Sequence, residues 1–154
     1  MRRLVLVRNK GRSILGQMIK LNENSGAISA KAHATQCVFT SSFEAELDGV
    51  ASAMKSISRV SNILNELRLK FSEVHHLWSD NVAMIEFVQG KGVAKGVRHM
   101  ELRMWYVREK YMQGNVALDY MEGAVIPADK LTKLGNSDSH KKFTENILGL
   151  RLLR

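Results

Sequence analysis

The chain has 154 residues, a formal net charge of +8 and an apolar content of 45%. This length corresponds to about one domain, and the composition is ordinary for a globular protein with one sizeable core. No apolar run approaches the roughly 18 residues of a membrane span, which excludes an integral membrane protein. The single cysteine, Cys37, excludes a disulfide-rich secreted fold and a zinc finger. An intracellular protein is therefore expected, with cytoplasm, nucleus and mitochondrion all open.

The positive charge is distributed unevenly along the chain. Before Phe43 a single acidic residue, Glu23, stands against seven lysines and arginines. A surface this basic favours phosphate groups, either of a nucleic acid or of anionic lipid headgroups. A solvated basic face, or one that meets an acidic protein, is the alternative.

The first third of the chain reads as three strands followed by a long helix. The predicted strands are residues 4–7, 13–21 and 27–40, separated by turn-forming residues. Val38 and Phe39 are the most strand-like part of the third. Ser41 and Glu44 have the spacing of a capping box, and an apolar stripe at helical spacing follows from Leu47 onward.

The rest of the chain alternates between helix and strand. In chain order, we predict a strand at 74–79, a helix at 80–89, a glycine- and lysine-rich loop at 90–96, a helix at about 97–113, a strand at 116–121, a helical turn after Pro127 and a last helix near 139–148. The order β-β-β-α-β-α-α-β-α-α predicts a single α/β domain over residues 1–154.

Three carboxylates occupy positions that suit a metal-dependent nuclease. Glu46 lies on the apolar stripe of the long helix, Asp80 follows a strand, and Asp129 opens a late helical turn. Carboxylates converging from such places can hold two divalent ions that activate water and stabilise the leaving oxygen. The alternative is structural, with Glu46 as an early-turn helix charge and the two aspartates as N-caps.

The histidines and tryptophans have simpler interpretations. His75 and His76 are neighbours in a strand, so they point to opposite faces and cannot easily share a metal ion. Trp78, Trp105 and Tyr106 could stack on nucleic-acid bases. For both tryptophans, however, the strand and helix positions favour a place in the core.

Short motifs along the chain resemble those of one family. Residues 41–46 read SSFEAE, 12–16 RSILG, 79–81 SDN, 98–103 RHMELR, 107–110 VREK and 126–133 IPADKLTK. They are similar, in order and near spacing, to SSTEAE, RSTSG, CDN, KHIDIR, IREK and QLADIFTK of the ribonuclease H domain in copia-type retrotransposon polyproteins. The resemblance covers residues 11–150. It implies a ribonuclease H-like fold, with a five-stranded mixed sheet crossed by the long first helix, and catalytic roles for Glu46, Asp80 and Asp129.

The chain departs from this family on its first strand. Active members carry an aspartate there that bridges the two metal ions, whereas this chain has no aspartate before Asp48. Asn9 offers one neutral oxygen, a weak substitute for a bridging carboxylate. Arg8 and Lys10 would instead place positive charge where the ions should lie. This departure predicts impaired catalysis.

Three functional hypotheses follow. The preferred one is a catalytically impaired, retrotransposon-derived ribonuclease H-like protein that binds RNA or an RNA–DNA hybrid and acts as a subunit of a larger ribonucleoprotein complex, without a membrane partner. The residues expected to contact nucleic acid are Arg8, Lys10, Arg12, Lys91, Lys95 and Arg98. The second is an active endoribonuclease that cuts the RNA strand of RNA–DNA hybrids, with Mg²⁺ or Mn²⁺ held by Glu46, Asp80 and Asp129. The third is a protein-only docking module.

Overall fold

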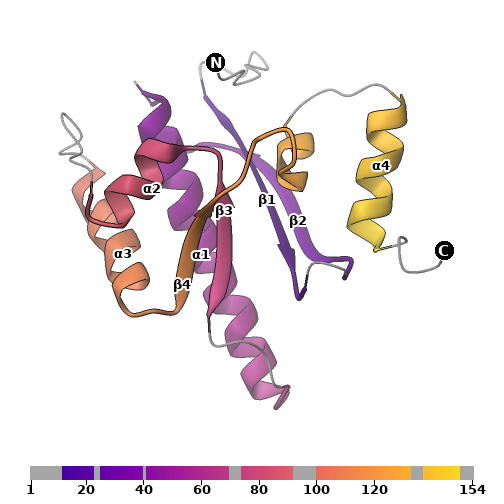
Figure 1. Cartoon of the computed structure of the whole chain (residues 1–154), viewed down its shortest axis with the longest axis horizontal. Coiled ribbons are helices and arrows are strands. Elements are labelled where there is room, and N and C mark those ends of the chain that lie inside the picture. The colour runs from indigo at the N-terminus through magenta and orange to yellow at the C-terminus, as the bar shows by residue number, and fades with distance from the viewer. Residues whose placement is uncertain are drawn as a thin grey trace. The chain divides into compact units, whose positions relative to one another are not determined.

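A computed structural model describes residues 12–22, 25–39, 41–69, 74–91, 100–132 and 137–149. Its elements, in chain order, are β1 (Ile14–Lys20), β2 (Ala27–Ala34), α1 (Ser42–Glu66), β3 (His75–Ser79), α2 (Val82–Val88), α3 (Glu101–Met112), β4 (Val116–Tyr120), the 3-10 helix η2 (Pro127–Leu131) and α4 (Ser137–Leu148) (Figure 1). The chain is therefore of mixed α/β class, as predicted. It divides into two compact units, one made of Met1–Val38 and Ala124–Arg154, and the other of Phe39–Gly123. We call them the terminal unit and the central unit.

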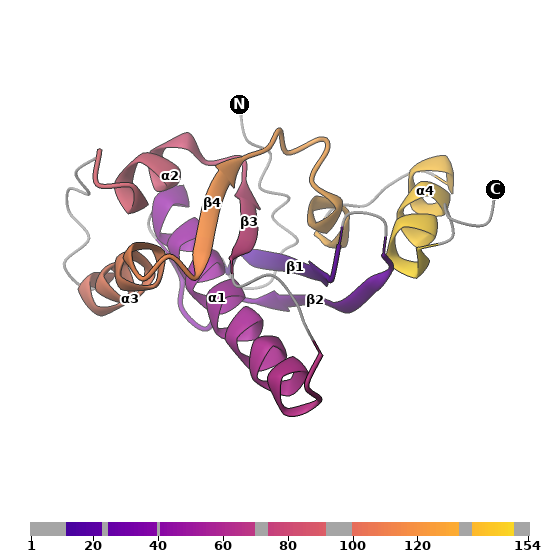
Figure 2. The same ribbon diagram turned by 60° about the horizontal axis from the view of Figure 1, so that its bottom comes forward.

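The terminal unit is built from both parts of the chain that flank the central one. Strands β1 and β2 form an antiparallel hairpin (Figure 2) in which Gly16 pairs with Ala32, and η2 and α4 pack against it. Two glycines allow close approach. A β-carbon on Gly16 would lie 2.5 Å from the Ala128 carbonyl oxygen, and one on Gly26 would lie 3.0 Å from that of Ile147. Packing of η2 and α4 onto the hairpin therefore depends on positions without side chains.

The central unit is organised around α1, a helix of 25 residues. The Ser41 side chain accepts a hydrogen bond from the Glu44 backbone N–H, which confirms the predicted cap. The apolar stripe is confirmed over its first half, where Leu47, Val50, Ala51, Met54 and Ile57 are buried. Its later members Ile63 and Leu67 are exposed.

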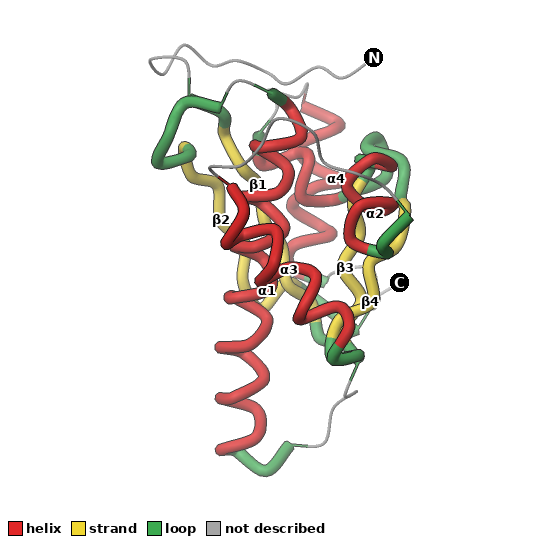
Figure 3. The backbone as a smooth tube through the Cα atoms, turned by 90° about the vertical axis from the view of Figure 1, so that its left-hand side faces the viewer, coloured by secondary structure: helices red, strands yellow, loops and turns green. Residues whose placement is uncertain are grey.

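Strands β3 and β4 of the central unit run parallel, with Leu77 opposite Leu118 (Figure 3). The core lies among α1, α2, α3 and this pair. Its most deeply buried side chains include Leu47, Met84, Val107 and Leu118. One face of the parallel pair is thus covered by apolar contacts within its own unit.

Four of the five predicted strands occur, three of them close to their predicted bounds, and residues 4–7 lie outside the described part. The third was predicted too long: Val38 and Phe39 are not in a strand. The Thr35 N–H makes a last bond to the Ser13 carbonyl, and the Thr35 hydroxyl then donates to the Cys37 carbonyl at 2.7 Å, which turns the chain out of the ladder. The strands form two two-stranded sheets in the described residues, so the five-stranded sheet stays a prediction.

The boundaries of two helices differ from those predicted. Helix α2 begins at Val82 rather than at residue 80, because Asn81 provides its cap. Helix α3 begins at Glu101 rather than near residue 97, and residues 92–99 are outside the described part. None of the described helices is long and apolar enough to span a membrane.

Candidate functional site

Asp80 stands at the carboxyl end of β3, where open α/β sheets place functional groups. The Met121 N–H donates to the Ser79 carbonyl at 3.1 Å, so the segment after β4 runs beside this position. A β-carbon on Gly123 would lie 2.8 Å from Oδ2 of Asp80. The absence of a side chain at Gly123 therefore leaves room for the exposed carboxylate.

The next residue, Asn81, carries the structural role that Asp80 was expected to have. Asn81 Oδ1 accepts from the Met84 N–H at 3.2 Å and caps α2, while its own N–H donates to Ser79 Oγ at 3.2 Å. The interpretation of Asp80 as an N-cap is therefore wrong. Asn81 is 2% exposed, and its Nδ2 has no hydrogen-bond partner among the described residues.

Glu46, the second candidate carboxylate, is half-buried on α1 and belongs to the central unit with Asp80. The acidic residue that is truly buried on this helix is Glu44, with 3% exposed. Glu44 is buried because of its spacing along the helix from the buried apolar residues. Glu44 precedes Leu47 by three residues and Ala51 by seven, which aligns it with the centre of the buried stripe.

Asp129, the third candidate, lies in the first turn of η2 and belongs to the terminal unit. It is not the cap of that turn, because Ile126 holds this position. Its carbonyl accepts from both the N–H and the hydroxyl of Thr132. Within the described ranges, no three His, Cys, Asp or Glu side chains gather as a group that could hold a metal ion.

The residues expected to contact nucleic acid are only partly described. Arg8, Asn9 and Lys10 lie outside the described residues, as do Lys95 and Arg98. The predictions made for them stay predictions. The two that are described, Arg12 before β1 and Lys91 after α2, are both exposed.

The two neighbouring histidines point in opposite directions, as predicted. His75 Nε2 lies 2.8 Å from Ser61 Oγ on α1, and burial lowers the pKa of His75 below its ordinary value of 6.5. His76 is exposed, and its Nδ1 lies 3.0 Å from Asp119 Oδ2 on β4. This geometry links β3 to α1 on one face and to β4 on the other.

Both tryptophans were expected in the core, and this expectation was wrong. Trp78 is 42% exposed and Trp105 is 63% exposed. On β3 the alternation of side chains puts Trp78 on the outer face with His76, whose ring stacks on it at 5.9 Å between centroids and 22° between planes. On α3 the buried residue is Val107, and Trp105 projects away from it. Tyr106, by contrast, is partly buried against the core.

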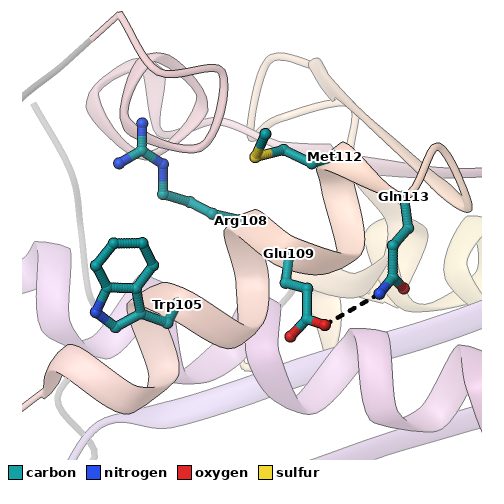
Figure 4. A pocket seen from close by; sticks show the side chains of 5 residues that line it. All are labelled: Trp105, Arg108, Glu109, Met112 and Gln113. Atoms are coloured by element: carbon teal, nitrogen blue, oxygen red, sulfur yellow. Dashed lines mark hydrogen bonds between the residues drawn. The ribbon is translucent and has the colours of Figure 1, made fainter.

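An open hollow of about 540 Å³ lies along α3 (Figure 4). Its lining is formed by four residues of α3, Trp105, Arg108, Glu109 and Met112, and by Gln113, which caps the end of this helix. Gln113 Nε2 donates to Glu109 Oε1 at 3.1 Å, and the Arg108 guanidinium lies over the Phe87 ring, 5.1 Å from its centroid. Sequence reasoning missed this exposed face, although Leu102, Trp105 and Met112 at spacings of three and seven residues could have indicated it.

Comparison with protein-family models, curated proteins and solved structures finds no match to this chain. The resemblance to the copia-type ribonuclease H domain therefore rests on the sequence motifs.

Proposed function

We propose that this chain is a retrotransposon-derived, ribonuclease H-like protein that binds RNA or an RNA–DNA hybrid and is impaired in cleaving it. The observation that carries the proposal is the net charge of +8, with cations such as Arg12 and Lys31 exposed. Positive charge favours binding to phosphate backbones, and this electrostatic attraction does not depend on the base sequence. We place the protein as a subunit of a larger ribonucleoprotein complex.

The proposed impairment follows from the sequence. Two-metal hydrolysis needs a carboxylate that bridges the ions, and no aspartate precedes Asp48. Asn9 would provide a single neutral oxygen in its place, and Arg8 and Lys10 would repel the ions.

The proposed fold is the five-stranded mixed sheet of ribonuclease H, crossed by α1. A mixed sheet contains antiparallel and parallel neighbours, and both kinds of pairing occur here, in β1–β2 and in β3–β4. The order of elements in the described residues supports the same proposal.

An active endoribonuclease is the second candidate, and Asp80 is the observation that favours it. Its carboxylate is exposed at the carboxyl end of β3, and Gly123 leaves space beside it. Asn81, not Asp80, caps α2, so the Asp80 carboxylate is not used for capping. In this case Glu46, Asp80 and Asp129 would hold Mg²⁺ or Mn²⁺, and these ions would activate the attacking water.

One experiment separates the candidates: cleavage of a labelled RNA–DNA hybrid in Mg²⁺ and in Mn²⁺, with binding of the same hybrid measured without metal. Asp80→Asn is the test variant. Asp119→Asn is the matched control, because Asp119 is also an exposed carboxylate of the same strand pair. We expect binding without cleavage in all three proteins.

The other outcomes are equally informative. Cleavage that is lost in Asp80→Asn and kept in Asp119→Asn would establish the active enzyme and refute the impairment. Neither binding nor cleavage would refute the proposed function and leave the protein-docking module.

A further inference from the structure

The charge of the protein is divided sharply between its two units. The terminal unit contains 13 lysines and arginines against four aspartates and glutamates, a net charge of +9. The central unit contains 10 against 11, a net charge of −1. The whole positive charge of the chain therefore belongs to the terminal unit, although this unit contains fewer than half of the residues.

Aromatic residues are divided in the opposite way. Of the ten Phe, Trp and Tyr residues, only Phe143 belongs to the terminal unit, and it is half-buried on α4. Proteins that hold single strands combine a basic groove with aromatic rings on which bases stack. The terminal unit has the cations but almost no rings, which suits contact with phosphates rather than with bases.

The exposed cations of this unit come from all of its parts. Arg12 precedes β1, Lys31 is on β2, Lys130 is on η2 and Lys141 is on α4, and all four are exposed. The elements that carry them contact one another, because η2 packs on β1 and β2, and α4 packs on β2 and η2. Folding thus gathers cations from both ends of the sequence into one compact body.

We propose that the terminal unit is the surface that binds nucleic acid, that it does so through the phosphate backbone without reading bases, and that the central unit adds little to affinity. This inference rests on the proposed function and names the surface responsible for it. It separates binding from Glu46 and Asp80, which belong to the other unit.

Two other kinds of partner, an anionic lipid surface and an acidic protein, suit this unit less well. Insertion into a lipid surface requires a broad exposed apolar helix face beside the cations. On α4, Leu148 is exposed, but Phe143 and Ile147 are half-buried. A protein interface usually centres on buried aromatic anchors, and the unit has one aromatic residue in all. Binding to a phosphate backbone requires positive charge and neither of these apolar features.

The test compares two triple charge reversals in the full chain. The first, in the terminal unit, is Arg12→Glu, Lys130→Glu and Lys141→Glu. The matched control, in the central unit, is Lys55→Glu, Arg59→Glu and Arg68→Glu. All six side chains are exposed, and both variants change the net charge equally. Binding of fluorescein-labelled RNA–DNA hybrids of several sequences is measured across a salt series, and far-UV circular dichroism checks folding.

We expect the terminal variant to lose affinity by about tenfold or more and to lower the slope of log K against log salt by about 3, one for each cation removed from a phosphate. The control should keep the affinity and slope of the parent. Should the triple variant fail to fold, Lys130→Gln with Lys141→Gln should lower the slope by about 2.

Three results would overturn the inference while leaving nucleic-acid binding intact: equal losses in both variants, a loss confined to the control, or affinities that differ more than about tenfold between hybrid sequences. Tighter binding to anionic phosphatidylserine vesicles than to any hybrid would assign the surface to lipid instead. A parent protein that binds no hybrid at all would refute the proposed function itself.

Discussion

Replacing Gly16 by alanine tests how the terminal unit is assembled. In an ordinary strand position this change stabilises a protein by about 0.4–1 kcal/mol, because it reduces the entropy of the unfolded chain. Here the added β-carbon would lie 2.5 Å from the Ala128 carbonyl oxygen and 3.0 Å from Thr132 Cγ2. The structure therefore predicts the opposite sign.

The expected loss of stability depends on which atom the new β-carbon would contact. Overpacking typically costs about 1–3 kcal/mol, and the upper part of this range applies because a carbonyl oxygen cannot rotate away as a side chain can. After the entropic gain, we expect Gly16→Ala to lower the free energy of unfolding by about 1–2 kcal/mol. For a chain of this size, that lowers Tm by about 2–8 °C.

Urea unfolding followed by far-UV circular dichroism is the suitable assay, because both tryptophans belong to the central unit and their fluorescence reports on that unit. The double variant with Thr132→Ser removes Cγ2 and keeps the hydroxyl that donates to the Asp129 carbonyl. It should recover only part of the loss, since the Ala128 carbonyl stays in place. A Gly16→Ala protein as stable as the parent, or more stable, would refute the close packing of β1 against η2.

Three further predictions concern the central unit. Burial lowers the folded-state pKa of His75 below the ordinary value of 6.5, so the stability that neutral His75 contributes is present above pH 6.5 and is lost as the pH falls below it. The urea midpoint of the parent should therefore fall in this pH range, and His75→Gln should flatten the fall. Met54 is 1% exposed and Met112 is 82% exposed. Met54→Ala should therefore lower the free energy of unfolding by about 2–5 kcal/mol, and Met112→Ala by less than about 0.5 kcal/mol. Similar losses in the two variants would contradict the burial pattern. Ser41→Ala removes the acceptor for the Glu44 N–H and should cost about 1 kcal/mol in chemical denaturation, whereas no loss would show that the cap is unimportant.

The local elements of this protein could be predicted from the sequence because their signals are local. The cap at Ser41 and the stripe from Leu47 both follow from residues a few positions apart, and both are found. The opposite orientation of His75 and His76 follows from the two-residue period of a strand. The boundaries at Thr35 and Asn81 were missed because each depends on a particular side-chain hydrogen bond that competes with the regular pattern.

The candidate site could be predicted less well from the sequence. Trp78 and Trp105 were assigned to the core because large apolar side chains are usually buried, yet exposure depends on which face of the finished element meets other elements. Likewise, Glu44 and Glu46 both lie at helical spacings from members of the apolar stripe, and packing decides that Glu44 is the more deeply buried of the two.

The sequence by itself determined the α/β class, the long capped helix, the net charge of +8 and the absence of an aspartate before Asp48. Only the tertiary structure decided that both ends of the chain share one compact unit, and hence that the positive charge is gathered there. The reason is physical. Charge and helical periodicity are properties of neighbouring residues, whereas the packing of η2 and α4 on the β1–β2 hairpin joins residues more than 100 positions apart.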